Sequence, residues 1–144
     1  DFVTFTEKIA DRKYIMKYIK NYVLFFTIIS IIILVGSYLF ASEILSIFGK
    51  EYMIYSDSFI ILIIGIIGIF LLRGVYGNLL ASIGRIEVNY YIICMALIIN
   101  VISNQYLIPI YGIKGAAITS AILMWFTGIL SWLCFVYLYR KKYR

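Results

Sequence analysis

Arg73 is the residue of this chain whose type and position most clearly indicate chemistry. It lies inside an apolar run over residues 59–81, FIILIIGIIGIFLLRGVYGNLLA. An arginine at such a depth in a bilayer costs roughly 2.5–3.5 kcal/mol on insertion scales, so it usually faces a protein interior or a hydrated cavity. Roughly 16 Å of helix separates Arg73 from Gly84, which is too far for the side chain to reach the headgroups easily.

The chemistry that suits Arg73 is the binding of an anion. A planar guanidinium donates paired hydrogen bonds to phosphate or carboxylate oxygens. No apolar run holds an acid that could pair with it, so its counter-charge is water, a substrate anion or a residue outside this sequence. An ion pair with such an outside residue is the alternative to a functional role. Phe70, Gly77 and Leu80 share its face at helical spacing, and Gly77 would leave room for a bulky headgroup.

Asn100 and Asn104 are the other candidate cavity residues. They lie one helical turn apart in the apolar run over residues 90–106. Side-chain amides at this depth can contact a ligand, and they can equally form hydrogen bonds between helices, worth about 0.6 kcal/mol each. Either role fits the sequence.

Other kinds of site find no support in the sequence. The chain has no histidine, which removes the commonest general base and zinc ligand. Cys94 and Cys134 are isolated in apolar runs, without metal or redox spacing. There is no Ser/His/Asp set, no phosphate loop and no pair of carboxylates in a pocket. We therefore predict no enzyme activity, no metal and no cofactor, and expect no nucleic-acid partner because the basic residues cluster at the chain ends.

The elements that must position these residues are membrane-spanning helices. Of the 144 residues, 64% are hydrophobic and 14% charged, which is too apolar for a soluble domain. A helix needs about 20 apolar residues to cross a bilayer. The sequence therefore predicts an all-α integral membrane protein with four transmembrane helices, at residues 21–42, 59–81, 90–106 and 116–139.

The two ends of the chain indicate the orientation. Residues 1–20 are expected to form an amphipathic segment at the headgroups, with Thr4 and Glu7 in a capping box, and residues 140–144 form a basic tail. Both ends and the turn at Arg85 are rich in basic residues, unlike the two other connections. The positive-inside rule therefore predicts cytoplasmic termini.

Small residues mark the expected helix contacts. Ala117, Ala121 and Gly128 follow one face of the fourth helix, together with Met124 and Ser131, and Gly77 and Ala81 form a similar set on the second. Close backbone approach must hold helices together in lipid, so these faces predict packing. Pro109 is expected to end the third helix, and Gly112 and Gly115 to allow a sharp external turn.

Three segments carry a resemblance to a known family. They are EILSIFGKEY, NLLASIGRIEVNY and LIPIYGIKGAAITSAI. In their order and spacing they resemble an external segment, a cytoplasmic turn and the last helical hairpin of bacterial polysaccharide flippases. These flippases belong to the multidrug/oligosaccharidyl-lipid/polysaccharide exporter superfamily. Together the segments and the helices between them cover most of the chain.

The resemblance implies a fold and a function. The chain would supply about the last four helices of a larger two-bundle transporter, with an N-terminal half as partner, because such transporters need two halves around one site. It would move an undecaprenyl-pyrophosphate-linked oligosaccharide across the bacterial cytoplasmic (inner) membrane, in contact with membrane lipids, for surface polysaccharide biosynthesis such as that of O-antigen. The alternatives are a multidrug exporter of the same superfamily and a structural membrane subunit that transports nothing.

Overall fold

The structure is a computed structural model that describes residues 8–143. Within these residues it is built of helices and contains no strand. In chain order the elements are α2 (Arg12–Ser46), the 3₁₀ helix η1 (Lys50–Tyr55), α3 (Ser56–Gly68), the π-helix η2 (Ile69–Arg73), α4 (Gly74–Ser82), α5 (Ile86–Tyr111) and α6 (Ile113–Lys142).

Four of the resulting units are long and apolar enough to cross a membrane. They are Arg12–Ser46, Lys50–Ser82, Ile86–Tyr111 and Ile113–Lys142. The predicted all-α class with four candidate spans is therefore confirmed. Each unit extends beyond its predicted range, because capping and charged residues at its ends also adopt helical backbone.

The first helix begins within the predicted headgroup segment. Asp11 caps it, and its carboxylate accepts hydrogen bonds from the backbone N–H groups of Lys13 (2.9 Å) and Tyr14 (3.3 Å). The helix then passes residue 20 without a break, and non-helical angles first occur at Phe40. The expected capping box at residues 4–7 lies outside the described residues.

The prediction that Pro109 ends the third helix is wrong. Helix α5 continues through Tyr111 with Pro109 inside its last turn. The proline lacks a backbone donor, but backbone N–H groups after it can still donate, as Gly112 does to the carbonyl of Ile108 at 2.8 Å. The helix ends at Gly112, whose φ of 58° is a conformation that favours glycine. Helix α6 begins at Ile113, so the turn between the two helices is a single residue.

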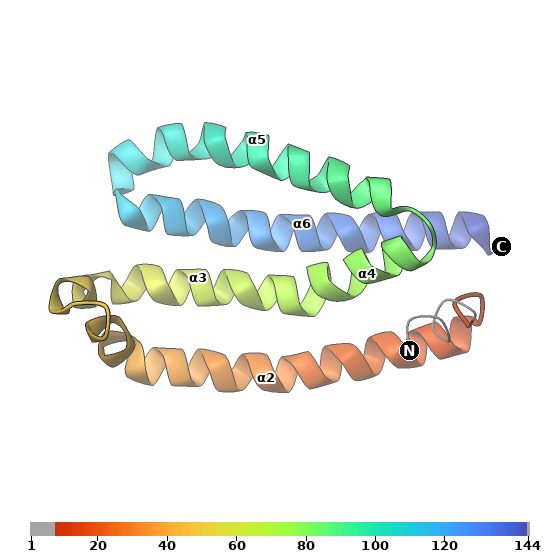
Figure 1. The fold of residues 1–144 in the computed structure, drawn as a ribbon, viewed down its shortest axis with the longest axis horizontal. Coiled ribbons are helices and arrows are strands. Elements are labelled where there is room, and N and C mark those ends of the chain that lie inside the picture. The colour runs from red at the N-terminus through yellow and green to blue at the C-terminus, as the bar shows by residue number, and fades with distance from the viewer. Residues whose placement is uncertain (1–7, 144) are drawn as a thin grey trace.

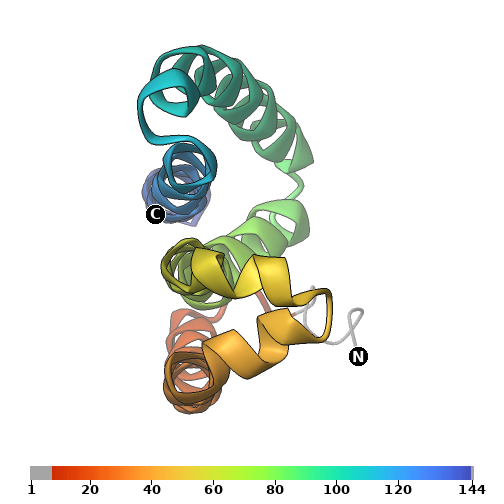
Figure 2. The same cartoon turned by 90° about the vertical axis from the view of Figure 1, so that its left-hand side faces the viewer.

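The four units lie side by side in one curved row (Figures 1 and 2). Helix α2 packs on α3, the α3–η2–α4 unit packs on α6, and α6 packs on α5. Helices α2 and α5 therefore form the two edges of the row, and α6 lies inside it. The start of α2, the α4–α5 turn and the end of α6 lie at the same end of the molecule (Figure 1).

Helix α6 crosses α3 and η2 at very short range. A side chain at Gly65 would place its Cβ 2.7 Å from the Cα of Ala121, and one at Gly68 would lie 2.8 Å from the Trp125 ring. The Trp125 indole N–H also donates to the carbonyl of Ile64 at 2.9 Å. The two units are thus held by close backbone approach, as expected for helices in lipid.

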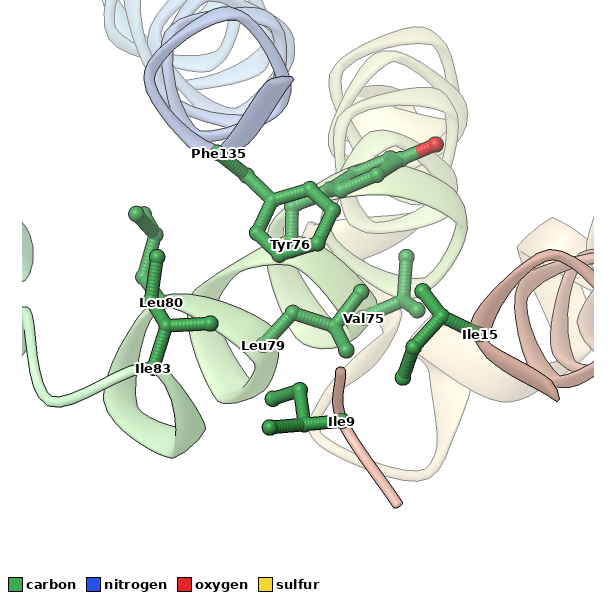
Figure 3. Close-up of a cluster of buried hydrophobic side chains, with 8 residues drawn as sticks. All are labelled: Ile9, Ile15, Val75, Tyr76, Leu79, Leu80, Ile83 and Phe135. Atoms are coloured by element: carbon green, nitrogen blue, oxygen red, sulfur yellow. The ribbon is translucent and has the colours of Figure 1, made fainter. Parts of the chain in front are cut away.

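A buried apolar cluster fixes the end of the molecule at which α2 begins and α6 ends (Figure 3). It joins the segment before α2, α2 itself, α4 and α6 through Ile9, Ile15, Val75, Tyr76, Leu79, Leu80, Ile83 and Phe135. Two hydrogen bonds from the end of α6 close it: the Tyr139 hydroxyl donates to the carbonyl of Ile9 (3.0 Å) and Lys142 Nζ to that of Ile83 (2.9 Å). The cluster provides a fixed base for the α4–α5 turn.

Candidate functional site

Arg73 is the last residue of the π-helix η2. The turn is closed by the Gly74 N–H, which donates to the carbonyl of Ile69, and it interrupts an otherwise α-helical span. Turns of this kind often occur at functional sites, because the extra residue redirects the side chains near it. The backbone of Arg73 also lies directly under α6, since a Cβ at Gly128 would fall 3.3 Å from its nitrogen.

Two neutral side chains hold the guanidinium. Arg73 Nη1 donates to Asn89 Oδ1 (2.6 Å) and to Ser131 Oγ (2.7 Å). Asn89 in turn donates through Nδ2 to the carbonyl of Gly77 (2.9 Å), and the Ser131 hydroxyl donates to the carbonyl of Thr127 (2.8 Å). We call Arg73, Asn89 and Ser131 the arginine clamp. It joins the η2–α4 unit, α5 and α6 at one point.

No carboxylate balances the charge of Arg73 within residues 8–143. The ion pairs there are Arg85–Glu87 and Lys114–Asp57, each with a distance of 3.2 Å. Both pairs are exposed and lie near the ends of the helices. Arg73 is therefore a cation without a counter-ion among the described residues, at a half-buried position inside a candidate span.

The guanidinium lines an open groove between α4 and α5 with a volume of about 400 Å³. The η2–α4 wall is mostly polar or small, and the α5 wall is mostly apolar, with Asn89 as the exception. The lining residues are Arg73, Gly74, Gly77, Asn78, Ala81, Ile86, Asn89, Tyr90 and Ile93. A groove of this composition suits an amphipathic ligand that has an anionic head and an apolar tail.

The face of Arg73 differs from its prediction in two ways. Gly77 and Ala81 line the groove, and Gly77 also meets α5: a Cβ there would lie 3.6 Å from Asn89 Oδ1, and its carbonyl accepts from Asn89 Nδ2. The space at Gly77 is filled by the arginine itself, because a Cβ there would lie 3.3 Å from Nη1. Phe70 and Leu80 turn away: the Phe70 ring contacts Phe26, with centroids 5.6 Å apart, and Leu80 is buried in the apolar cluster. The π turn changes the spacing, so Phe70 leaves the face of Arg73.

Asn100 and Asn104 lie apart from the arginine clamp. Asn104 Nδ2 donates to Asn100 Oδ1 within the same helix, at 2.9 Å. Asn100 follows Asn89 by three helical turns, which is roughly 16 Å along α5. The Oδ1 atom of Asn104 is buried and accepts no hydrogen bond from the described residues. The structure thus does not bring the three candidate cavity residues together.

The small face of α6 is turned inward. Ala117, Ala121 and Gly128 are buried, and Ser131 is completely so. Gly128 lies against Leu72 and the carbonyl of Gly68. The same face thus carries both the contact with η2 and one partner of Arg73.

Comparison with protein-family models, with curated proteins and with solved structures yields no match to this chain. The resemblance to polysaccharide flippases therefore depends on the three sequence segments alone.

Sequence reasoning missed one member of the arginine clamp and misjudged another. Asn89 was treated as part of a turn segment, and Ser131 only as a small packing residue. Both are distant from Arg73 in the chain, and no spacing rule connects them. The available signal was chemical. Asn89 and Ser131 are polar residues in or next to apolar runs, and the apolar runs contain an arginine but no acid that could pair with it.

Proposed function

We propose that this chain is part of a bacterial flippase. It would move an undecaprenyl-pyrophosphate-linked oligosaccharide from the inner to the outer leaflet of the cytoplasmic membrane. The observation that carries the proposal is the uncompensated positive charge of Arg73 in a groove with an apolar wall. A pyrophosphate needs a cationic partner, and its polyprenyl tail needs an apolar one.

The order of the helices supports a role within a larger assembly. The four units form a row with an open side, so an enclosed path across the membrane needs helices from another part of the transporter. We assign that part to the N-terminal half implied by the family resemblance.

The distribution of charge supports cytoplasmic termini. Among residues 8–143, basic residues clearly outnumber acids at the end of the molecule that holds the α4–α5 turn, and acids slightly outnumber basic residues at the opposite end. At the first end are the basic residues Lys8, Arg12, Lys13, Lys17, Lys20, Arg85, Arg140, Lys141 and Lys142 and the acids Asp11 and Glu87; at the other are the basic residues Lys50 and Lys114 and the acids Glu43, Glu51 and Asp57. The positive-inside rule places the first end in the cytoplasm.

Cysteine labelling in intact cells tests this orientation. With Cys94 and Cys134 replaced by serine, a single cysteine at position 50 should react with a membrane-impermeant maleimide. A single cysteine at position 142 should react only after the cells are opened. Labelling of position 142 from outside would contradict the orientation.

Substitution of Arg73 tests the function. In cells that depend on this protein, Arg73→Ala should abolish most surface glycan assembly while the protein remains at its normal level. Arg73→Lys should restore it only in part, because an ammonium does not reproduce the paired donors of a guanidinium. Arg85→Ala is the matched control, since Arg85 is exposed and lies outside the groove. Glycan assembly at the wild-type rate by an abundant Arg73→Ala protein would refute the proposal.

A further inference from the structure

The acceptors of the arginine clamp are both uncharged. A carboxylate would be the ordinary partner for an arginine in a membrane span, because it would offset the cost of burying the charge. Here an amide oxygen and a hydroxyl take that place, at 2.6 and 2.7 Å from Nη1. The position of the guanidinium is therefore fixed while its charge is left intact.

Each acceptor is itself fixed by a second hydrogen bond. Asn89 is held by the backbone of α4 and Ser131 by the backbone of α6. The side-chain amide of Asn89 has one orientation that satisfies both contacts: Oδ1 accepts from Arg73, and Nδ2 donates to the carbonyl of Gly77. Because Nη1 donates to side chains on two different helices, the guanidinium cannot rotate freely.

The opposite edge of the guanidinium makes no such contact. Over residues 8–143, Nε and Nη2 of Arg73 form no hydrogen bond, and the residue lines the groove. This edge offers two parallel N–H donors, which match two oxygens of one phosphate group.

We propose that Asn89 and Ser131 are positioning residues that hold Arg73 by one nitrogen and present its free edge, with its full charge, to a phosphate group of a polyprenyl ligand. This inference depends on the proposed function for its ligand class. It adds that the neutrality of Asn89 determines whether the site accepts an anion. An acid at position 89 would occupy the same space and form an ion pair with Arg73 in place of the ligand.

The test uses the full-length protein purified in detergent, with farnesyl diphosphate as the probe and farnesol as the probe without phosphate. The wild-type protein should bind the diphosphate and not the alcohol. Asn89→Asp should weaken diphosphate binding by about tenfold or more, because the new carboxylate neutralises Arg73 and repels the phosphate. Its melting temperature should stay close to that of the wild type, because the new ion pair with Arg73 offsets the lost hydrogen bond to the Gly77 carbonyl. A merely structural role for Asn89 would not give this combination.

Two further variants separate charge from position. Asn89→Ala removes the acceptor without adding a charge, so it should weaken binding less than Asn89→Asp. Gln105→Glu adds the same charge to an exposed position of the same helix more than four turns away and outside the groove, and binding should stay near the wild-type value.

The outcomes distinguish the inference from the proposed function. Equal binding by Asn89→Asp and wild type, or no diphosphate binding by the wild type, would overturn the inference. Expected binding results combined with normal surface glycan in cells carrying Arg73→Ala would support the anion site and contradict the flippase function. Expected binding results combined with loss of surface glycan in Asn89→Asp cells would support both.

Discussion

Gly128→Leu should destabilise the folded protein by about 3 kcal/mol and sharply reduce its yield from membranes. Gly128 lies where α6 crosses the π turn. A Cβ at this position would fall 2.8 Å from the Cβ of Leu72 and 3.2 Å from the carbonyl oxygen of Gly68. The second contact is with backbone, which cannot move aside as a flexible side chain can. The two units would have to separate, and separation would also pull Ser131 away from Arg73.

Gly36→Leu is the matched control for this substitution. Gly36 is also a glycine within a helix, but a Cβ there meets nothing within 4 Å. Because leucine has a higher helix propensity than glycine, by about 1 kcal/mol, this variant should be as stable as the wild type or slightly more so. Thermal melting in detergent, followed by size-exclusion chromatography, compares the two. Similar melting temperatures for both variants would show that α6 does not depend on this crossing.

Gly115→Val should disrupt the α5–α6 hairpin, with an expected cost of about 2–3 kcal/mol. The residue lies in the first turn of α6, directly against the end of α5. A Cβ there would overlap the carbonyl of Leu107, lying 2.8 Å from its carbon, and would be 3.2 Å from Tyr111 Cβ. A single residue, Gly112, joins the two helices. The connection is therefore too short to let α5 and α6 move apart without distortion.

The hairpin substitution is best measured by protease sensitivity and melting temperature in detergent. Gly36→Val carries the same substitution at an open helical position and controls for the low helix propensity of valine. Gly115→Val should be cleaved near residue 112 at protease concentrations that leave the control intact. An equal cleavage rate in the two variants would mean that the close contact at Leu107 is unimportant.

The sequence was sufficient for the helices because their signal is local. Each span is a long apolar run, and a backbone in lipid must satisfy its own hydrogen bonds. The small residues of α6 were recognised for a similar reason: Ala121 and Gly128 recur at helical spacing, and close approach is the main force between helices in lipid. The C-terminal end of α5 was predicted too early, because Pro109 was expected to end the helix.

The site was harder to predict because it depends on contacts that are not local. Arg73 could be singled out from its charge alone, whereas its partners Asn89 and Ser131 lie on two other helices. The π turn was also missed. No composition rule distinguishes residues 69–73 from ordinary helix, and the turn arises where Gly68 and Gly128 let α6 come close.

The order of the helices in the row has a consequence for biosynthesis. The α3–η2–α4 unit makes its closest contacts with α6, which leaves the ribosome after the other three units. Until then this unit has only α2 and the start of α5 as neighbours among the described helices. Each early span must therefore stay in the bilayer through its own apolarity. The spans Arg12–Ser46 and Lys50–Ser82 are indeed more apolar than the two that follow. We therefore expect membrane insertion to precede assembly of the row. The partners of the Arg73 side chain are complete only when both α5 and α6 have been made.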